Sequence, residues 1–392
     1  MHQPLFSIVI PSKDRPNSIE NLIWSVLEQN FSDFEIIICD NSTNDLTQEV
    51  IKRFKDDRIV NIKTGNLKMY ENWNCGINAV LGKYMMLISD KAFLKQGALI
   101  YLKNLIYAKK YKCITWKLDT YVEPNTLLTQ PTNSDSREVK SSELIKAILG
   151  ADYYGFEDAP MHCTSCVSME VISEIKNKHK NVCQALNPDY TMAMHILLSI
   201  KSVYRINQNL ALLIRPSFLE SFGNGAGFLK KTESNRNFMR EYIDWFQNTN
   251  DSKEIPIKDN HFIIDIILKD VYEILKCYKI DPDTFLNQQD RLTGYYFHTF
   301  KEILWRKRMG VNMSDEYKLW IQAFNGEITL IQDKVNQKRE FWRLLLLKAN
   351  LIYFIKTNPL TAYLLSIYRA FKYKDFGKKF NDIEDYYKKN EV

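Results

Sequence analysis

The sequence predicts an α/β protein with a mainly parallel sheet, followed by an all-helical C-terminal part. From Leu5 to Leu118, short apolar runs that end in polar turn residues alternate with helical patterns. Such alternation is typical of βαβ units, whose strands lie parallel. Beyond about Lys230 the pattern is almost wholly helical. With 392 residues, 45% apolar and 26% charged, the chain can form one large soluble domain or two ordinary ones.

The first two strands are the clearest elements. Residues 5–10 form an apolar run that ends at Pro11, and residues 34–39 form a second that ends at Asp40. Between them Ile19, Leu22 and Val26 recur at helical spacing, which predicts an amphipathic helix. The same alternation predicts helices over residues 46–54, 71–80 and 96–107, strands over 59–62, 84–88 and 112–118, and a loop over 123–142.

The C-terminal part divides into a helical domain over residues 231–335 and basic amphipathic helices over 336–392. The expected helices cover residues 235–248, 259–278, 283–309 and 315–356. From about Asn336, Leu, Tyr, Phe and Trp are interspersed with Lys and Arg. This pattern suits the headgroup region of an anionic membrane, where each basic residue contributes about 1 kcal/mol. The alternative is packing against the rest of the chain or a second subunit.

Composition excludes several classes of protein. The net charge of +6 is modest, and exposed aromatic residues between basic residues on a sheet face are not evident, so we expect no nucleic-acid partner. No run reaches the ~18–20 apolar residues that span a bilayer, and no secretory pattern is seen. Cys163 and Cys166 form a lone C-x-x-C without a second ligand pair, which favours buried thiols over zinc. We therefore expect a cytoplasmic protein with reduced cysteines.

Polar residues follow three of the predicted strands directly. Ser12, Lys13 and Arg15 come after the first strand, Asp40 after the second, and Asp90 after residues 84–88. Side chains beyond the carboxyl ends of parallel strands line the ligand site of an open α/β sheet. The sequence thus predicts a site for a charged small molecule such as a nucleotide. An Asp after a strand can also be a helix cap or turn former.

Three blocks resemble the family 2 glycosyltransferases, which have the Rossmann-like GT-A fold. The first is Ser7-Ile-Val-Ile-Pro11-Ser-Lys-Asp-Arg15-Pro, and the second is Glu35-Ile-Ile-Ile-Cys-Asp40-Asn-Ser-Thr-Asn-Asp45. The third extends from Asn72 to Tyr84. The resemblance covers residues 5–230 and implies that this part is a catalytic domain that binds a nucleotide sugar.

The resemblance also implies roles for residues in these blocks. Asp40 would bind the uracil of the donor, and Asn72 and Asp90 would belong to the donor site. The residues of the first turn would line the base and the diphosphate, namely Pro11, Ser12, Lys13 and Arg15. A carboxylate can accept the N–H of a base, and a cation can face phosphate oxygens.

The third block departs from the family at the metal motif. The family has an Asp-x-Asp motif that holds the ribose and a divalent cation, whereas this chain has Asp90-Lys91-Ala92. In one interpretation Lys91 supplies the positive charge at the leaving diphosphate, and no metal is required. If Asp90 suffices as a ligand, Mn²⁺ or Mg²⁺ is used. In the remaining interpretation the site has lost its catalytic activity, and the chain binds its ligand without transferring a sugar.

Two further residues are candidates for the acceptor side. Asp189, in Asn187-Pro188-Asp189-Tyr190, resembles the family's catalytic base before an apolar helix, although it could instead cap that helix. His162 lies where such enzymes meet the acceptor. An isolated His can also be purely structural.

Together these features predict an inverting glycosyltransferase. It would move a sugar from a nucleotide donor, expected to be a UDP-sugar, to a hydroxyl of a glycan or lipid-linked acceptor in bacterial surface polysaccharide assembly. The tail would bind the inner face of the cytoplasmic membrane, and the chain could form a homo-oligomer. The alternative is a non-catalytic scaffold that binds sugar nucleotides or glycans.

Overall fold

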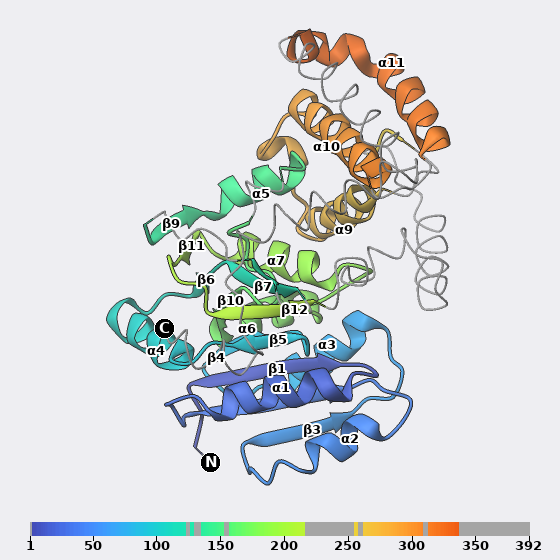
Figure 1. Ribbon diagram of the computed structural model, residues 1–392. Helices are drawn as coiled ribbons and strands as arrows, with labels where there is room; N and C mark the ends of the chain where they lie inside the picture. Colours follow the sequence, from blue (N-terminus) through green and yellow to red (C-terminus); the bar gives the residue numbers. More distant parts are fainter. Residues whose placement is uncertain are drawn as a thin grey trace. The chain divides into compact units, whose positions relative to one another are not determined.

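The computed structural model describes residues 2–122, 126–128, 135–152, 157–215, 255–257, 262–308 and 313–336. These residues divide into two compact units (Figure 1). The first holds the described residues up to Ile145 and those of 157–215. The second holds residues 146–152 and those from 255 onward.

The first unit contains the sheets. Its elements are β1 (Phe6–Ser12), α1 (Pro16–Leu27), β2 (Phe34–Asp40), α2 (Leu46–Ile51), β3 (Ile59–Lys63), α3 (Met69–Asn78), β4 (Tyr84–Leu87), β5 (Ala92–Leu94), α4 (Ala98–Lys109), β6 (Cys113–Thr115), β7 (Leu118–Val122), β8 (Thr126–Leu128), β9 (Arg137–Lys140), β10 (Ser165–Ser168), α6 (Met169–His179), α7 (Pro188–Ser199), β11 (Ser202–Arg205) and β12 (Ala211–Arg215). Helix α5 (Ser141–Leu149) begins in this unit and ends in the second.

The large sheet has the strand order β3-β2-β1-β4-β10-β6-β11-β9 (Figure 1). Strands β3, β2, β1 and β4 are parallel neighbours, and β10 runs antiparallel to β4 and β6. The central strands are apolar on both faces because helices cover them. Ile8 and Ile36, for example, belong to the same buried core as Ile19 and Leu22 of α1. The predicted α/β class with a mainly parallel sheet is confirmed.

A second sheet, β5-β12-β7-β8, was not expected. The predicted single strand over 112–118 is wrong, because β6 ends at Thr115 in the large sheet and β7 begins at Leu118 in the small one. The side chain of Trp116, between them, is buried in the core. The loop expected over 123–142 is also wrong, because β8 pairs with β7 and β9 pairs with β11. Strand pairing, with the adjacent β7 and the distant β11, overrides the polar composition of this segment.

The second unit is helical in its described part. Its further elements are α9 (Ile263–Cys277), the short 3₁₀ helix η3 (Pro282–Thr284), α10 (Gln288–Arg308) and α11 (Ser314–Asn336). Tyr295 of α10 donates a hydrogen bond to Asp265 of α9 at 2.8 Å, and burial raises the pKa of Asp265. A Cβ at Gly294 would overlap the backbone of Gly150, so α10 and this segment approach each other closely.

Part of the C-terminal prediction falls outside the described residues. This applies to the helix over 235–248 and to the basic amphipathic helices beyond Asn336. Within the described residues, no helix combines the length and the apolarity that crossing a membrane requires.

Acid sensitivity is expected from His195 in α7. Its side chain is fully buried, and its Nε2 accepts a hydrogen bond from the Gln184 amide nitrogen at 3.1 Å. Burial, together with the smaller effect of the adjacent His179, lowers the pKa of His195 to about 3. The unfolded chain, with a His pKa of about 6.5, therefore binds more protons than the folded chain between these values. Stability that is present above the unfolded pKa is lost as the pH falls through this window.

We expect His195→Gln to weaken this dependence. Between about pH 6 and pH 4, the parent should lose about 1.4 kcal/mol more per pH unit than the variant. Urea unfolding of both proteins at several pH values measures the difference. Parallel pH profiles would show that His195 does not cause the acid sensitivity.

Candidate functional site

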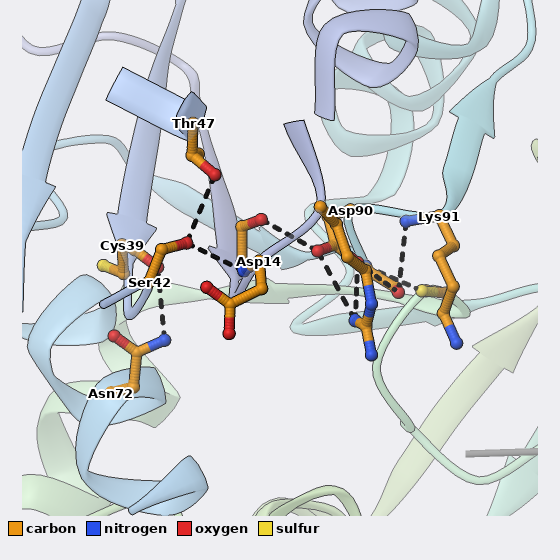
Figure 2. A network of polar contacts seen from close by, with 11 residues as sticks. Asp14, Cys39, Ser42, Thr47, Asn72, Asp90 and Lys91 are labelled. Atoms are coloured by element: carbon orange, nitrogen blue, oxygen red, sulfur yellow. Dashed lines mark hydrogen bonds and ion pairs between the residues drawn. The ribbon is translucent and has the colours of Figure 1, made fainter. Parts of the chain in front are cut away.

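The carboxyl ends of β2, β1 and β4 meet at one edge of the large sheet. Ser12 at the end of β1 lies opposite Asp40 at the end of β2. The Ser12 hydroxyl donates a hydrogen bond to Asp90 Oδ2 at 2.8 Å. Figure 2 shows Ser42 and Thr47 on one side of this polar network, with Asp90 and Lys91 on the other. The structure thus places Asp40 and Asp90 on the two sides of Ser12, as the strand-end pattern predicts.

Asp40 is fully buried and held by its own segment. Its Oδ1 accepts the Ser42 N–H at 3.0 Å, and its Oδ2 accepts the Gln48 side-chain amide at 2.6 Å. An ionised carboxylate offers about four acceptor positions, so the two bonds leave capacity for another donor. Because the side chain has no exposed surface, a nucleotide base can reach it only when neighbouring side chains move.

The other residues predicted for the donor site differ in their surroundings. Asn72 is buried, accepts a hydrogen bond from Thr64 at 2.6 Å and donates one to the Cys39 carbonyl at 3.2 Å, which fixes α3 against the end of β2. Lys13 is exposed and donates to Asn66 at 2.7 Å. Pro11 lies opposite Cys39 in the sheet register.

The turn after β1 is tied to the turn after β2. Asp14 has the left-handed φ of 55°, and its N–H donates to the Ser42 hydroxyl at 2.8 Å. The Ser42 hydroxyl lies 3.2 Å from the Thr47 hydroxyl at the start of α2 (Figure 2). These bonds hold the first and second sequence blocks in a fixed relation.

Asp90 makes an ion pair with Arg15. The Arg15 Nη1 lies 3.1 Å from Oδ1 and 3.5 Å from Oδ2 of Asp90. The Ser89 hydroxyl also donates to Oδ1, at 3.4 Å. The Asp90 side chain is 1% exposed, whereas the Arg15 side chain is 47% exposed. The carboxylate therefore lies inside the protein and the guanidinium reaches its surface.

His162 and Asp189 form a second polar pair. The His162 Nδ1 lies 3.6 Å from Asp189 Oδ2, and the His162 ring is 5.3 Å from the Trp73 ring of α3. Burial lowers the pKa of His162, the charge of Asp189 raises it, and the charge of Lys91 lowers it again. The charge of Lys91 therefore acts on His162.

Cys163 connects the residues that follow β4 with the pair formed by His162 and Asp189. Its Sγ accepts the Ser89 N–H at 3.0 Å, so residues 162–163 are joined to the segment that follows β4. Burial raises the pKa of Cys163 to about 12; the Ser89 N–H bond and the charge of Lys91 act to lower it, and the charges of Asp90 and Asp189 act to raise it. The charges of Asp90, Lys91 and Asp189 therefore all act on this thiol. In the sequence Cys163 stands out only as part of the C-x-x-C, because its contact with Ser89 depends on the fold.

Asp189 is the second residue of α7 rather than its N-cap, which is Asn187. Its Oδ1 accepts the Tyr190 N–H at 3.0 Å, and its Oδ2 faces His162. The segment before α7 is held by Asn74 of α3, which accepts the N–H groups of Val182 and Cys183 at 3.1 Å each. Asn74 also donates to the Cys183 carbonyl at 2.7 Å. No sequence signal singled out Asn74, because Asn within a helix is unremarkable.

The surroundings of Asp90 do not fit a divalent cation. Mg²⁺ and Ca²⁺ require several oxygen ligands, and carboxylates supply most of the charge. Asp90 is engaged by Ser12 and Arg15, and Lys91 follows it directly. Among the described residues, no group of three or more His, Cys, Asp or Glu side chains is arranged to hold a metal. Asp90 as a ligand for Mn²⁺ or Mg²⁺ is not supported by this set of contacts.

Residues 7–169 match the model of glycosyl transferase family 2. This part of the chain is a family 2 glycosyltransferase domain. The match includes β1, β2 and β4 with the polar edge formed by Ser12, Asp40 and Asp90. The GT-A type of α/β fold predicted from the sequence is confirmed for this glycosyltransferase domain.

The curated relatives are bacterial glycosyltransferases. One is the GalNAc(5)-diNAcBac-PP-undecaprenol beta-1,3-glucosyltransferase of Campylobacter jejuni, 32% identical over 24% of this chain and 32% of its own length. Another is the UDP-Glc:alpha-D-GlcNAc-diphosphoundecaprenol beta-1,3-glucosyltransferase WfaP of Escherichia coli, 34% identical over 22% of this chain and 35% of its own length. The chain thus spans about a third of these relatives.

Among solved structures, the chain is similar to S. aureus TarS 1-349 in complex with UDP-GlcNAc. The two chains are 12% identical, the alignment covers 90% of each, and the TM-score is 0.48.

Proposed function

We propose that this chain transfers a sugar from a nucleotide donor, of the UDP-sugar type, to a hydroxyl of a glycan or lipid-linked saccharide with inversion at the anomeric carbon. The observation that carries the proposal is the link through Cys163 between Asp90 and Lys91 after β4 and the pair His162 and Asp189. The two curated relatives support the substrate class, because both names give an undecaprenol diphosphate sugar as acceptor and one gives UDP-Glc as donor.

The reaction assigns a role to each group. Asp189 accepts the proton of the acceptor hydroxyl as its oxygen bonds to the anomeric carbon. The bond from that carbon to the diphosphate oxygen breaks, and the electron pair leaves with the diphosphate. Lys91 stabilises the negative charge of this leaving group. His162, beside Asp189, contacts the acceptor.

The donor binds at the strand edge in this proposal. Asp40 recognises the base, and Asp90 contributes to the ribose and diphosphate end. The remaining residues of this site are Pro11, Ser12, Lys13, Arg15 and Asn72. Asn72 acts by positioning, because both ends of its amide are bonded within the fold.

We also propose a division of the chain into domains. Residues 1–230 form the catalytic domain, 231–335 a helical domain, and 336–392 a basic tail that binds the inner face of the cytoplasmic membrane. A homo-oligomer is compatible with this arrangement. The expected setting is bacterial surface polysaccharide assembly, where the acceptor is attached to a membrane lipid.

A second candidate function is a non-catalytic scaffold that binds nucleotide sugars or glycans. Two observations favour it, namely the replacement of the acidic motif by Asp90-Lys91-Ala92 and the complete burial of Asp40.

A donor screen followed by a transfer assay tests the proposal. We expect UDP-sugars to raise the melting temperature, since a ligand at 100 times its Kd stabilises a protein by about 2.7 kcal/mol. The stabilising donor should then support transfer to a lipid-linked saccharide, with an inverted anomeric centre by NMR. Stabilisation without transfer or donor hydrolysis would favour the scaffold. If no nucleotide sugar binds, the transferase and a scaffold for nucleotide sugars are both excluded.

A further inference from the structure

We infer that Arg15, anchored by Asp90, binds the donor diphosphate in place of a divalent cation. Asp90 then acts as a positioning residue for this guanidinium and is not a metal ligand. The inference rests on the proposed function, because it assumes that the donor carries a nucleoside diphosphate.

The difference in exposure between the two partners supports this assignment. Asp90 is 1% exposed and fixed from one side by the Ser12 hydroxyl at 2.8 Å. Arg15 contacts Asp90 through Nη1 alone, and nearly half of its side chain is exposed. A guanidinium has five N–H donors in a planar fork that matches phosphate oxygens. One end of the fork can therefore remain on Asp90 while the other donors face a phosphate.

The position of Arg15 in the fold points to the same ligand. It is the N-cap residue of α1, a helix of 12 residues whose first turn contains no acidic side chain. A helix N-terminus carries a partial positive charge that favours anions. Asn17 and Ser18, in the same first turn, bring no negative charge of their own.

Lys91 supplies a second positive charge near this group. It directly follows Asp90, and its charge acts on both His162 and Cys163. Arg15 is thus ion-paired with the Asp90 carboxylate, and Lys91 is the next residue in the chain. A metal ion bound to Asp90 would be repelled by both, whereas the two negative charges of a diphosphate would be attracted.

Binding of UDP and of uridine, measured by calorimetry in EDTA and in Mg²⁺ or Mn²⁺, tests the inference without an activity assay. We expect the parent chain to bind UDP in EDTA, with an affinity that changes by less than about threefold when metal is added. Arg15→Ala should weaken UDP binding by about 10- to 100-fold, the usual effect of losing hydrogen bonds to a charged group, and should leave uridine binding unchanged.

Two further variants sharpen the test. Asp90→Asn keeps the size of the side chain but removes the charge that holds Arg15, so it should weaken UDP binding to the same extent in EDTA and in Mn²⁺. Arg53→Ala is the matched control, because Arg53 is an exposed arginine paired with Glu20 of α1. It should bind UDP as the parent does. Melting temperatures confirm that each variant is folded.

The outcomes distinguish a failure of the role inferred for Arg15 from a failure of the proposed UDP-sugar donor. If metal increases UDP affinity about tenfold or more, and Asp90→Asn abolishes that increase, Asp90 is a metal ligand and the inference is wrong. If Arg15→Ala weakens uridine and UDP equally, Arg15 acts on the fold or the base and the inference is also wrong. If the parent binds neither UDP nor uridine, the proposed UDP-sugar donor itself is wrong.

Discussion

The Asp189→Asn variant is expected to bind the donor with unchanged affinity and to turn over about 10²- to 10⁴-fold more slowly. Asn keeps the shape of the side chain and can still bond the Tyr190 N–H and face His162, as Asp189 does at 3.0 and 3.6 Å. It cannot accept a proton. Calorimetric titration with UDP and steady-state kinetics separate these two properties in one variant.

Glu170→Gln is the matched control for this exchange. Glu170 is the second residue of α6, as Asp189 is of α7, but it is exposed and pairs with Lys112. Both exchanges remove a first-turn carboxylate that stabilises a helix N-terminus by about 0.3–1 kcal/mol. Only the Asp189 variant should lose turnover. Turnover close to that of the parent, or a loss equal in both variants, would remove Asp189 from the mechanism.

Removal of the Asn74 side chain is expected to lower both stability and turnover. Asn74→Ala leaves the N–H groups of Val182 and Cys183 without their partner, together with the Cys183 carbonyl. A buried polar group left unpaired costs about 1–3 kcal/mol, so we expect a total loss of about 3 kcal/mol or more. Urea unfolding measures this loss.

Turnover of the folded Asn74→Ala enzyme should also fall, because the freed segment leads into α7 and Asp189. Asn78→Ala is the control, since Asn78 is exposed on the same helix. It should change stability by less than about 0.5 kcal/mol. If Asn74→Ala unfolds at the same urea concentration as Asn78→Ala, the bonds to residues 182–183 do not hold this segment.

The proximity of His162, Lys91 and Asp189 has a consequence for the chemistry of the site. His162, whose pKa is lowered mainly by burial, is favoured as the neutral imidazole and does not compete as a second charge. The structure thus pairs a buried imidazole with the Asp189 carboxylate at 3.6 Å.

Local patterns in the amino-acid sequence are enough to predict the central strands and the polar residues that follow them. The apolar runs at 5–10, 34–39 and 84–88 became β1, β2 and β4, and the turns after them supplied Ser12, Asp40 and Asp90. These features depend on the alternation of buried residues and on turn chemistry, both of which operate within a few residues.

Only the tertiary structure decided which of these residues act together. The pairs Arg15 with Asp90 and Asn74 with Cys183 are 75 and 109 residues apart in the chain. The separation of β6 from β7, and the pairing of β9 with β11, likewise depend on partners far along the chain. Such contacts form because distant surfaces bury one another and their polar groups must then find partners, which no local pattern encodes.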